Sequence, residues 1–181
     1  MIESKESNHW LMGEIYGTAP SLFIQQNWPK LLPHWSKPPQ TLLLVCFRAQ
    51  ENLSFVNETV QREKDRLWQA FHHCAQRLHP IAQSQGILLE AICPKTGLAV
   101  QAPPQSGIFD LVYLFHDRLG FPWQRTTQGC KVVTHPRWQQ AFYPALWISP
   151  QDSDRVTALV YDSLSSPMRE PWSKLTITTL N

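Results

Sequence analysis

The chain lacks the features that mark membrane, secreted and nucleic-acid-binding proteins. No run reaches the roughly 18 consecutive apolar residues that a membrane span needs. Residues 1–7 have neither the apolar core of a signal peptide nor the arginine-rich character of a transit peptide. A net charge of +2 gives no basic stripe of the kind that nucleic-acid binders carry. We therefore expect a cytoplasmic protein that binds neither nucleic acid nor membrane.

Common enzyme motifs are also missing. The sequence holds no glycine-rich phosphate loop after a strand, no nucleophile elbow and no His-Glu-x-x-His zinc motif. The four cysteines are far apart and form no Cys-x-x-Cys pair, which argues against a zinc site and against a disulfide framework. They are Cys46, Cys74, Cys93 and Cys130. This pattern fits a reducing compartment, and no standard enzyme is indicated.

Prolines and tryptophans are abundant instead. The 181 residues include 15 prolines and 8 tryptophans, against only 7 glycines. The length suits one domain over residues 1–181, since domains usually hold roughly 100–200 residues. Tryptophan is enriched at protein interfaces, so we expect the protein to bind a partner.

Hydrophobic patterns predict the main elements. Residues 41–47 are continuously apolar, which is typical of a central strand covered on both faces. From Asn57 to about His79, apolar residues recur every three or four positions and predict the longest helix. Asn57 should cap this helix, Pro80 should stop or kink it, and its charged residues 62–66 should face water.

Further elements complete a predicted α+β fold with a mainly antiparallel sheet flanked by helices. Residues 86–93 and 97–101 read as a hairpin, because Gly97 can adopt the positive φ that closes the turn at 94–96. Residues 108–119 read as an amphipathic helix, with a strand as the competing interpretation. The other expected strands are 11–16, 130–135, 141–149 and 175–178, and the other expected helices are 21–32, helical or irregular, and one from Asp152 or Asp154 to Leu164.

The candidate functional residues gather in the run 129–135, Gly-Cys-Lys-Val-Val-Thr-His. A thiolate is a nucleophile and a metal ligand, and nearby cations lower the pKa of a thiol. In a strand, however, Cys130 would lie on one face while Lys131 and His135 lie on the other. Gly129 marks a bulge or a close approach of a ligand to the backbone. Two roles for Cys130 stay open, a functional thiol and a small buried hydrophobe.

Two other sets of residues have structural interpretations. His72, His73 and Cys74 resemble a metal cluster, but adjacent helical positions point about 100° apart. We interpret Cys74 as part of the apolar helix face, with the histidines beside it. Trp123 and Trp138 suit either the core or an interface.

A resemblance to a known family rests on several segments in register. They are 42–47, the long helix, Pro94-Lys95-Thr96-Gly97-Leu98-Ala99, Leu119-Gly120-Phe121, and the run 129–135 with Trp138. In order and spacing, over about residues 15–150, they resemble the methylmalonic aciduria and homocystinuria type D family, the CblD cobalamin-trafficking proteins. Residues 151–181, a predicted helix and tail, are poorly covered by this resemblance.

The resemblance implies a nitroreductase-like α+β fold that has lost the use of flavin. It also implies a homodimer or a complex with the type C cobalamin-processing protein. The family passes cobalamin to its dependent enzymes, so the resemblance implies an adaptor rather than an enzyme. Such a protein binds no cofactor by itself and shares cobalamin with its partner.

The resemblance further implies a site. In vertebrate-like members two successive cysteines open the strand, and one supplies a sulfur ligand to cobalt. Here the pair is Gly129-Cys130, so Cys130 is the candidate cobalt ligand, and whether it replaces the family's ligating cysteine stays open. The alternatives are a flavin- or thiol-dependent nitroreductase-like oxidoreductase and a plain dimeric interaction module. The candidate residues are Cys130, Gly129, Lys131 and His135 toward the cofactor, and Trp123 and Trp138 toward a partner.

Overall fold

The computed structural model describes residues 12–101, 103, 105–165 and 174–180. The strands are β1 (Met12–Thr18), β2 (Thr41–Arg48), β3 (Glu90–Ile92), β4 (Trp123–Arg125), β5 (Lys131–Val133), β6 (Phe142–Ser149) and β7 (Lys174–Thr179). The helices are α1 (Leu22–Leu31), α2 (Glu58–Ser84), α3 (Leu111–Leu119) and α4 (Ser153–Ser165). Position 11 of the predicted first strand lies outside the described residues, as do positions 166–173 of the predicted tail.

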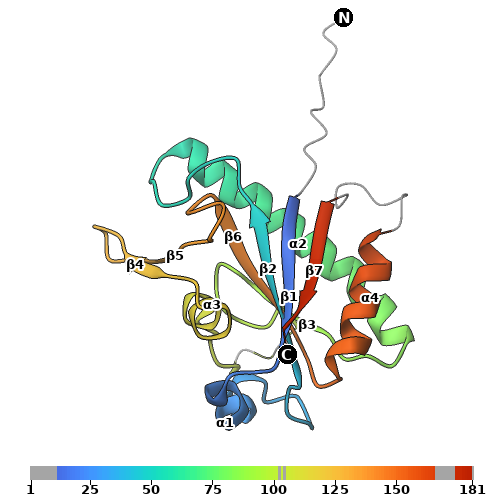
Figure 1. Ribbon diagram of the computed structural model, residues 1–181. Helices are drawn as coiled ribbons and strands as arrows, with labels where there is room; N and C mark the ends of the chain where they lie inside the picture. The colour runs from blue at the N-terminus through green and yellow to red at the C-terminus, as the bar shows by residue number, and fades with distance from the viewer. Residues whose placement is uncertain (1–11, 102, 104, 166–173, 181) are drawn as a thin grey trace, which may run out of the picture.

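A mixed sheet forms the centre of the molecule (Figure 1). Its strand order is β3-β6-β2-β1-β7, and β4 and β5 form a separate hairpin. In the main sheet three pairings are antiparallel and only β1 with β7 is parallel. The prediction of an α+β fold with a mainly antiparallel sheet is therefore confirmed.

Strand β2 lies in the middle of this sheet, as its apolar sequence predicts. Every residue from Thr41 to Phe47 is buried. Its side chains alternate between two hydrophobic clusters: Leu43 packs on one side of the sheet and Leu44 on the other. On its flanks β2 pairs with β1 and with the full length of β6.

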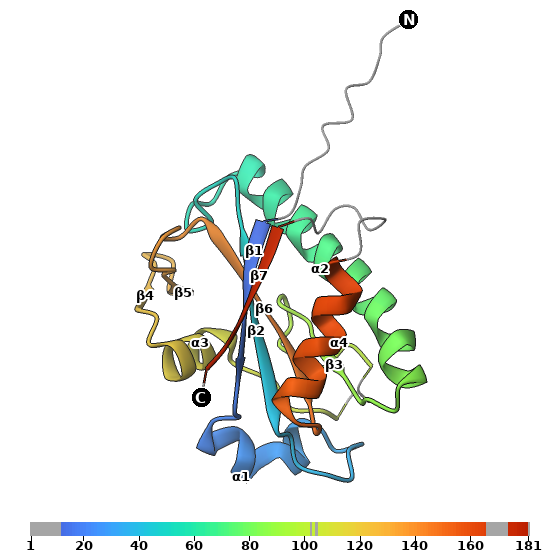
Figure 2. The ribbon, with the colours of Figure 1, turned by 45° about the vertical axis from the view of Figure 1, so that its right-hand side comes forward.

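Helices pack on both faces of the sheet (Figure 2). On one face, Leu67 and Phe71 of α2 and Val156 and Val160 of α4 join the cluster that contains Leu43. Helix α3 packs on the opposite face, and α1, which lies at the ends of the strands, adds to the same hydrophobic cluster on that face. Their contributions to the cluster that contains Leu44 are Ile24, Leu31, Leu111, Leu114 and Phe115.

Helix α2 begins where its sequence predicts. The Asn57 side chain accepts a hydrogen bond of 2.9 Å from the Val60 N–H and caps the helix. Of the two expectations for Pro80, a stop or a kink, the stop is wrong, because α2 continues to Ser84. Pro80 lacks one backbone N–H near the end of a 27-residue helix, so most of the backbone hydrogen bonds remain. None of the described helices is both long and apolar enough to cross a membrane.

The charged stretch of α2 departs from its predicted exposure. Glu63 is buried and accepts hydrogen bonds of 2.7 and 2.8 Å from the Arg66 guanidinium. It also accepts a hydrogen bond of 2.8 Å from the Gln50 N–H, which ties α2 to the end of β2. The expectation that residues 62–66 all face water is therefore wrong at Glu63, whose carboxylate is satisfied by these donors.

Other boundaries shift for local reasons. Residues 97–101 do not form a full strand: only Ala99 bridges to Ile92, because the Gly97 carbonyl accepts instead from the Phe109 N–H at 2.8 Å. The turn itself forms as predicted, with Gly97 at φ +69°. Residues 108–119 are helical only from Leu111, since Asp110 caps the helix. Asp152 caps α4 in the same way, as predicted.

We predict that both faces of β2 contribute to stability. Leu43→Ala and Leu44→Ala should each lower the free energy of unfolding by about 2–5 kcal/mol, because each leaves a cavity on its own side of the sheet. Urea denaturation measures this. The control Leu22→Ala, at a leucine 67% exposed on α1, should change stability by less than about 1 kcal/mol. A large loss for only one of the two core variants would contradict the two-sided burial of β2.

Candidate functional site

Cys130 ends the loop that connects β4 to β5. It is exposed, whereas Cys46, Cys74 and Cys93 are buried. The predicted strand 130–135 is shorter than expected and covers only β5, so Cys130 belongs to the loop. The Thr126 side-chain oxygen accepts a hydrogen bond of 3.2 Å from the Cys130 N–H, which fixes the backbone at the thiol.

Gly129 is required by the geometry of this loop. The Thr126 N–H donates to the Cys130 carbonyl at 2.8 Å, and the Gly129 N–H donates to the Thr126 carbonyl at 2.9 Å. These bonds leave a three-residue loop closed by Gly129 at φ +82°, the arrangement of a hairpin with a glycine bulge. A Cβ at Gly129 would meet no atom within 4 Å. The positive φ therefore explains the glycine, and no neighbouring group crowds its backbone.

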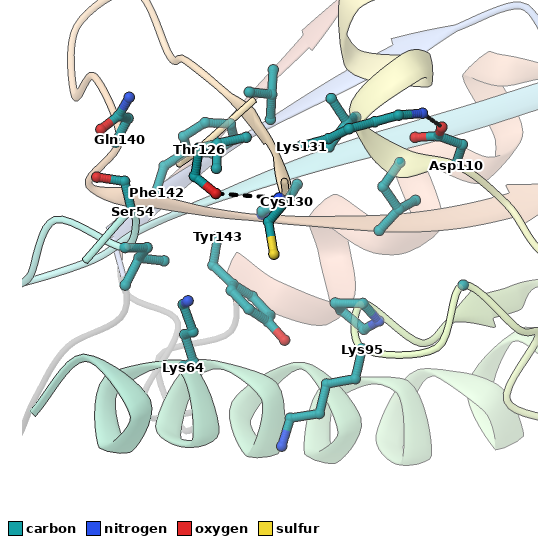
Figure 3. A pocket seen from close by; sticks show the side chains of 18 of the residues that line it. Ser54, Lys64, Lys95, Asp110, Thr126, Cys130, Lys131, Gln140, Phe142 and Tyr143 are labelled. Atoms are coloured by element: carbon teal, nitrogen blue, oxygen red, sulfur yellow. Dashed lines mark hydrogen bonds and ion pairs between the residues drawn. The ribbon is translucent and has the colours of Figure 1, made fainter. Parts of the chain in front are cut away.

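A pocket of about 460 Å³ lies beside the hairpin. Its walls come from the hairpin, α2, the turn at 94–97, the start of α3, the start of β6, and Leu53, Ser54 and Val56. Figure 3 shows the Cys130 sulfur pointing into this space toward Tyr143, which extends from β6. The volume falls within the range of small-molecule sites. The structure thus places Cys130 where a molecule in the pocket would touch its thiol.

Lys131 lines the same pocket but is directed away from Cys130. Its ammonium contacts Asp110 at 2.5 Å and lies 5.9 Å from the centre of the Trp123 ring. Burial would raise the pKa of Asp110, but hydrogen bonds from Lys131 and from the Tyr113 N–H hold that pKa below its ordinary value. Strand alternation predicts this separation of Lys131 from the thiol, and the ion pair fixes it.

His135 lies outside the pocket and is almost fully buried, at 1% exposure. Its Nδ1 accepts hydrogen bonds from the N–H groups of Arg137 at 3.1 Å and Trp138 at 3.2 Å. Its Nε2 lies 3.1 Å from a Glu14 carboxylate oxygen and donates to it. Burial lowers the pKa of His135 to about 4, so the ring is neutral. His135 organises the turn after β5 and does not meet Cys130 in one site.

The sequence pattern did not identify Glu14 as part of this cluster. Glu14 is buried on β1, where it accepts a hydrogen bond from the Tyr16 hydroxyl and pairs with the Arg137 guanidinium. The signal was available, because Glu14 stands in an otherwise uncharged strand next to the buried Ile15. A buried carboxylate of this kind requires partners, and His135 and Arg137 provide them.

The two candidate partner-surface tryptophans have different environments. Trp123 is 42% exposed on β4, beside Lys131. Trp138 is partly buried and stacks on the His135 ring, with centroids 4.2 Å apart and planes at 10°. Trp123 is therefore the tryptophan available to a partner, while Trp138 belongs to the packing around His135.

A second chemically distinctive cysteine, Cys93, was missed. It sits at the end of β3 and accepts a hydrogen bond of 3.4 Å from the Trp68 indole N–H of α2. Burial opposes ionisation, but donors from Thr96, Trp68 and the neighbouring His72 lower the pKa of Cys93 to about 6.

Cys46 and Cys74 are buried and less easily ionised than Cys93. Cys74 is buried in the cluster under α2, which confirms its interpretation as a core residue. Burial raises the pKa of both Cys46 and Cys74. The periodicity of α2 placed Cys74 correctly, but it could not show that α2 also brings Trp68 against Cys93.

We predict a pH dependence of stability that comes from His135. The unfolded chain protonates this histidine near the ordinary histidine pKa of 6.5, and the folded chain does so only near 4. The free energy of unfolding should therefore fall as the pH drops through this window, by up to about 1.4 kcal/mol per pH unit. Urea denaturation across the window should show a smaller slope for His135→Asn, and an unchanged slope for His73→Gln at an exposed histidine. Equal slopes for the wild type and His135→Asn would contradict this account.

We also predict that Cys93 is a thiolate at neutral pH. The ultraviolet thiolate absorbance that Cys93→Ser removes should titrate with a midpoint near pH 6. Trp68→Phe should move this midpoint upward, because it removes the N–H donor to the sulfur. Cys74→Ser should leave the transition in place. A midpoint above pH 8 in the wild type would show that the donors do not stabilise the thiolate.

The candidate site therefore consists of an exposed thiol and a pocket, and the buried cluster around His135 lies outside it. No family model matches the chain, and no curated protein matches it. The function has to be inferred from the residues of the site and from the resemblance of the sequence.

Proposed function

We propose that the protein is a cytoplasmic CblD-like adaptor that binds a cobalamin-processing partner and offers the Cys130 thiolate to the cobalt of the partner's cobalamin. The observation that carries this proposal is the position of Cys130. It is the one exposed thiol of the four, at the end of a hairpin loop that stands apart from the main sheet. Its sulfur points into an open pocket (Figure 3).

The chemistry suits a soft metal ion in a shared site. Thiolate sulfur is a soft donor, and an axial sulfur alters the redox behaviour of the metal that it binds. The hairpin extends from the sheet edge beside α3 (Figure 1), so a partner can reach it without displacing the core. Trp123 is exposed on the same hairpin and supplies an aromatic contact of the kind that interfaces favour.

The fold and the glycine at the position of the family's first cysteine are both compatible with this proposal. A mixed sheet with helices on both faces is compatible with a nitroreductase-like fold that no longer uses flavin. Gly129 stands where the family's first cysteine would be, and its φ of +82° disfavours any other residue. Cys130 is then the thiol that this chain presents to cobalt.

A thiol-dependent oxidoreductase is the second candidate. The lowered pKa of Cys93 favours it, because a thiolate at neutral pH attacks disulfides and other electrophiles. The turn that follows Cys93, residues 94–97, lines the pocket that Cys130 also faces. Turnover of a disulfide substrate that depends on Cys93 and not on Cys130 would favour this candidate over the adaptor.

The test of the adaptor uses cob(II)alamin with and without a type C-like cobalamin-processing protein. With the partner present, the wild type should shift the visible and electron paramagnetic resonance spectra of cobalt, since sulfur would become a ligand. Cys130→Ser should abolish the shift. The matched control Thr127→Ser, in the same exposed loop, should retain it.

Gel filtration of the same samples separates the two parts of the proposal. Cys130→Ser should still elute with the partner, because the interface involves more than one side chain. A wild-type complex without a spectral shift would contradict the ligation of cobalt by Cys130. The absence of any complex would contradict the adaptor role as well.

A further inference from the structure

We propose that the pocket beside Cys130 is a binding site for a small carboxylate with an apolar body, whose carboxylate pairs with the Lys64 ammonium. The inference does not depend on the proposed role in cobalamin trafficking, because it concerns the isolated chain and a ligand that pairs with Lys64. Among the charged side chains around the pocket, one has no partner of opposite charge.

Lys64 supplies that uncompensated charge. It extends from α2, and Figure 3 shows its amine pointing into the pocket. Its side chain is half-buried, and no carboxylate among the described residues pairs with it. A partly desolvated ammonium gains more from a counter-ion than a fully hydrated surface lysine does.

The other two lysines of the pocket already have partners. The Lys95 ammonium lies 2.6 Å from Asp65 and 4.4 Å from the centre of the Trp68 ring, so it turns back toward α2. Lys131 contacts Asp110 at 2.5 Å. One lysine out of three is therefore left to receive an anion from outside.

Neutral donors lie on the same walls. Tyr143 points its hydroxyl into the pocket (Figure 3), and that hydroxyl makes no hydrogen bond to the described residues. Burial raises the pKa of Tyr143, so the phenol keeps its proton and can donate it to a carboxylate oxygen. Ser54 and Gln140 line the pocket too and add further polar groups.

Apolar side chains form the rest of the pocket. Phe109, Val133 and Phe142 are buried residues whose atoms reach its surface. Val56 and Ile108 line it as well, although they are 73% and 69% exposed. These side chains offer an apolar surface to the body of a ligand whose charged group reaches Lys64.

The charge of the walls selects a monoanion. The Asp110 carboxylate and the Lys131 ammonium on the same walls balance each other, so Lys64 leaves one uncompensated positive charge, which a monoanion matches. The sequence also has no glycine-rich loop to surround a phosphate with backbone N–H groups. A carboxylate needs only the one free ammonium and the nearby hydroxyl donor.

The test compares naphthalene-2-carboxylate with its neutral isostere naphthalene-2-carboxamide and with inorganic phosphate. Each is titrated into the isotope-labelled full chain, and nuclear magnetic resonance shifts give the affinity and the residues contacted. The carboxylate should bind the wild type about tenfold more tightly than the carboxamide, with shifts at Cys130 and Tyr143, because only the carboxylate pairs with Lys64.

Two variants test whether the Lys64 ammonium causes the preference for the carboxylate over the carboxamide. Lys64→Gln should bind both compounds equally, because the free ammonium is gone. Lys37→Gln, which removes an exposed lysine outside the pocket, should keep the tenfold preference. Equal binding of the two compounds to the wild type would overturn the inference, and this comparison needs no variant to fold. Tighter binding of phosphate than of the carboxylate would also overturn it.

Discussion

Seven of the eight residues of strand β2 are buried, so side chains from other elements must pack against both of its faces. This constraint positions α2 and α4 on one side of the sheet, and the residues of α1 and α3 fill the cluster on the other. It also requires a full-length neighbour, which β6 provides. The far end of that pairing, at Phe142 and Tyr143, forms one wall of the pocket. The site is thus built on the most buried pair of strands, while the thiol itself sits on a short external hairpin.

Two buried carboxylates hold neighbouring loops in place. Glu14 lies among apolar side chains, and its carboxylate holds His135 and Arg137 in the turn that leads from β5 to β6. Glu63 does the same where β2 ends, through the Gln50 N–H. Because a buried carboxylate without partners is costly, each of these contacts limits how far the adjacent loop can move. The turn that follows the Cys130 hairpin is therefore held in place by buried polar contacts.

The sequence was sufficient where a single local pattern decides the structure. The unbroken apolar run of β2, the cap at Asn57 and the positive φ at Gly97 each follow from one residue type in one context. It was insufficient where elements far apart in sequence meet. Strand β4 has three exposed residues and thus no hydrophobic pattern to read. The Trp68 donor to Cys93 and the place of Lys64 in the pocket depend on how α2 lies over the sheet, which periodicity alone does not give.

Selective alkylation of the folded chain tests the central claim most directly, namely that Cys130 is presented to other molecules. The protein is treated with the neutral reagent N-ethylmaleimide, and the modified cysteines are mapped by mass spectrometry over time. Cys130 should be modified first, while Cys46 and Cys74 should react only after denaturation, since both are buried and burial raises the pKa of each. Modification of Cys130 no faster than that of Cys46 would contradict the account.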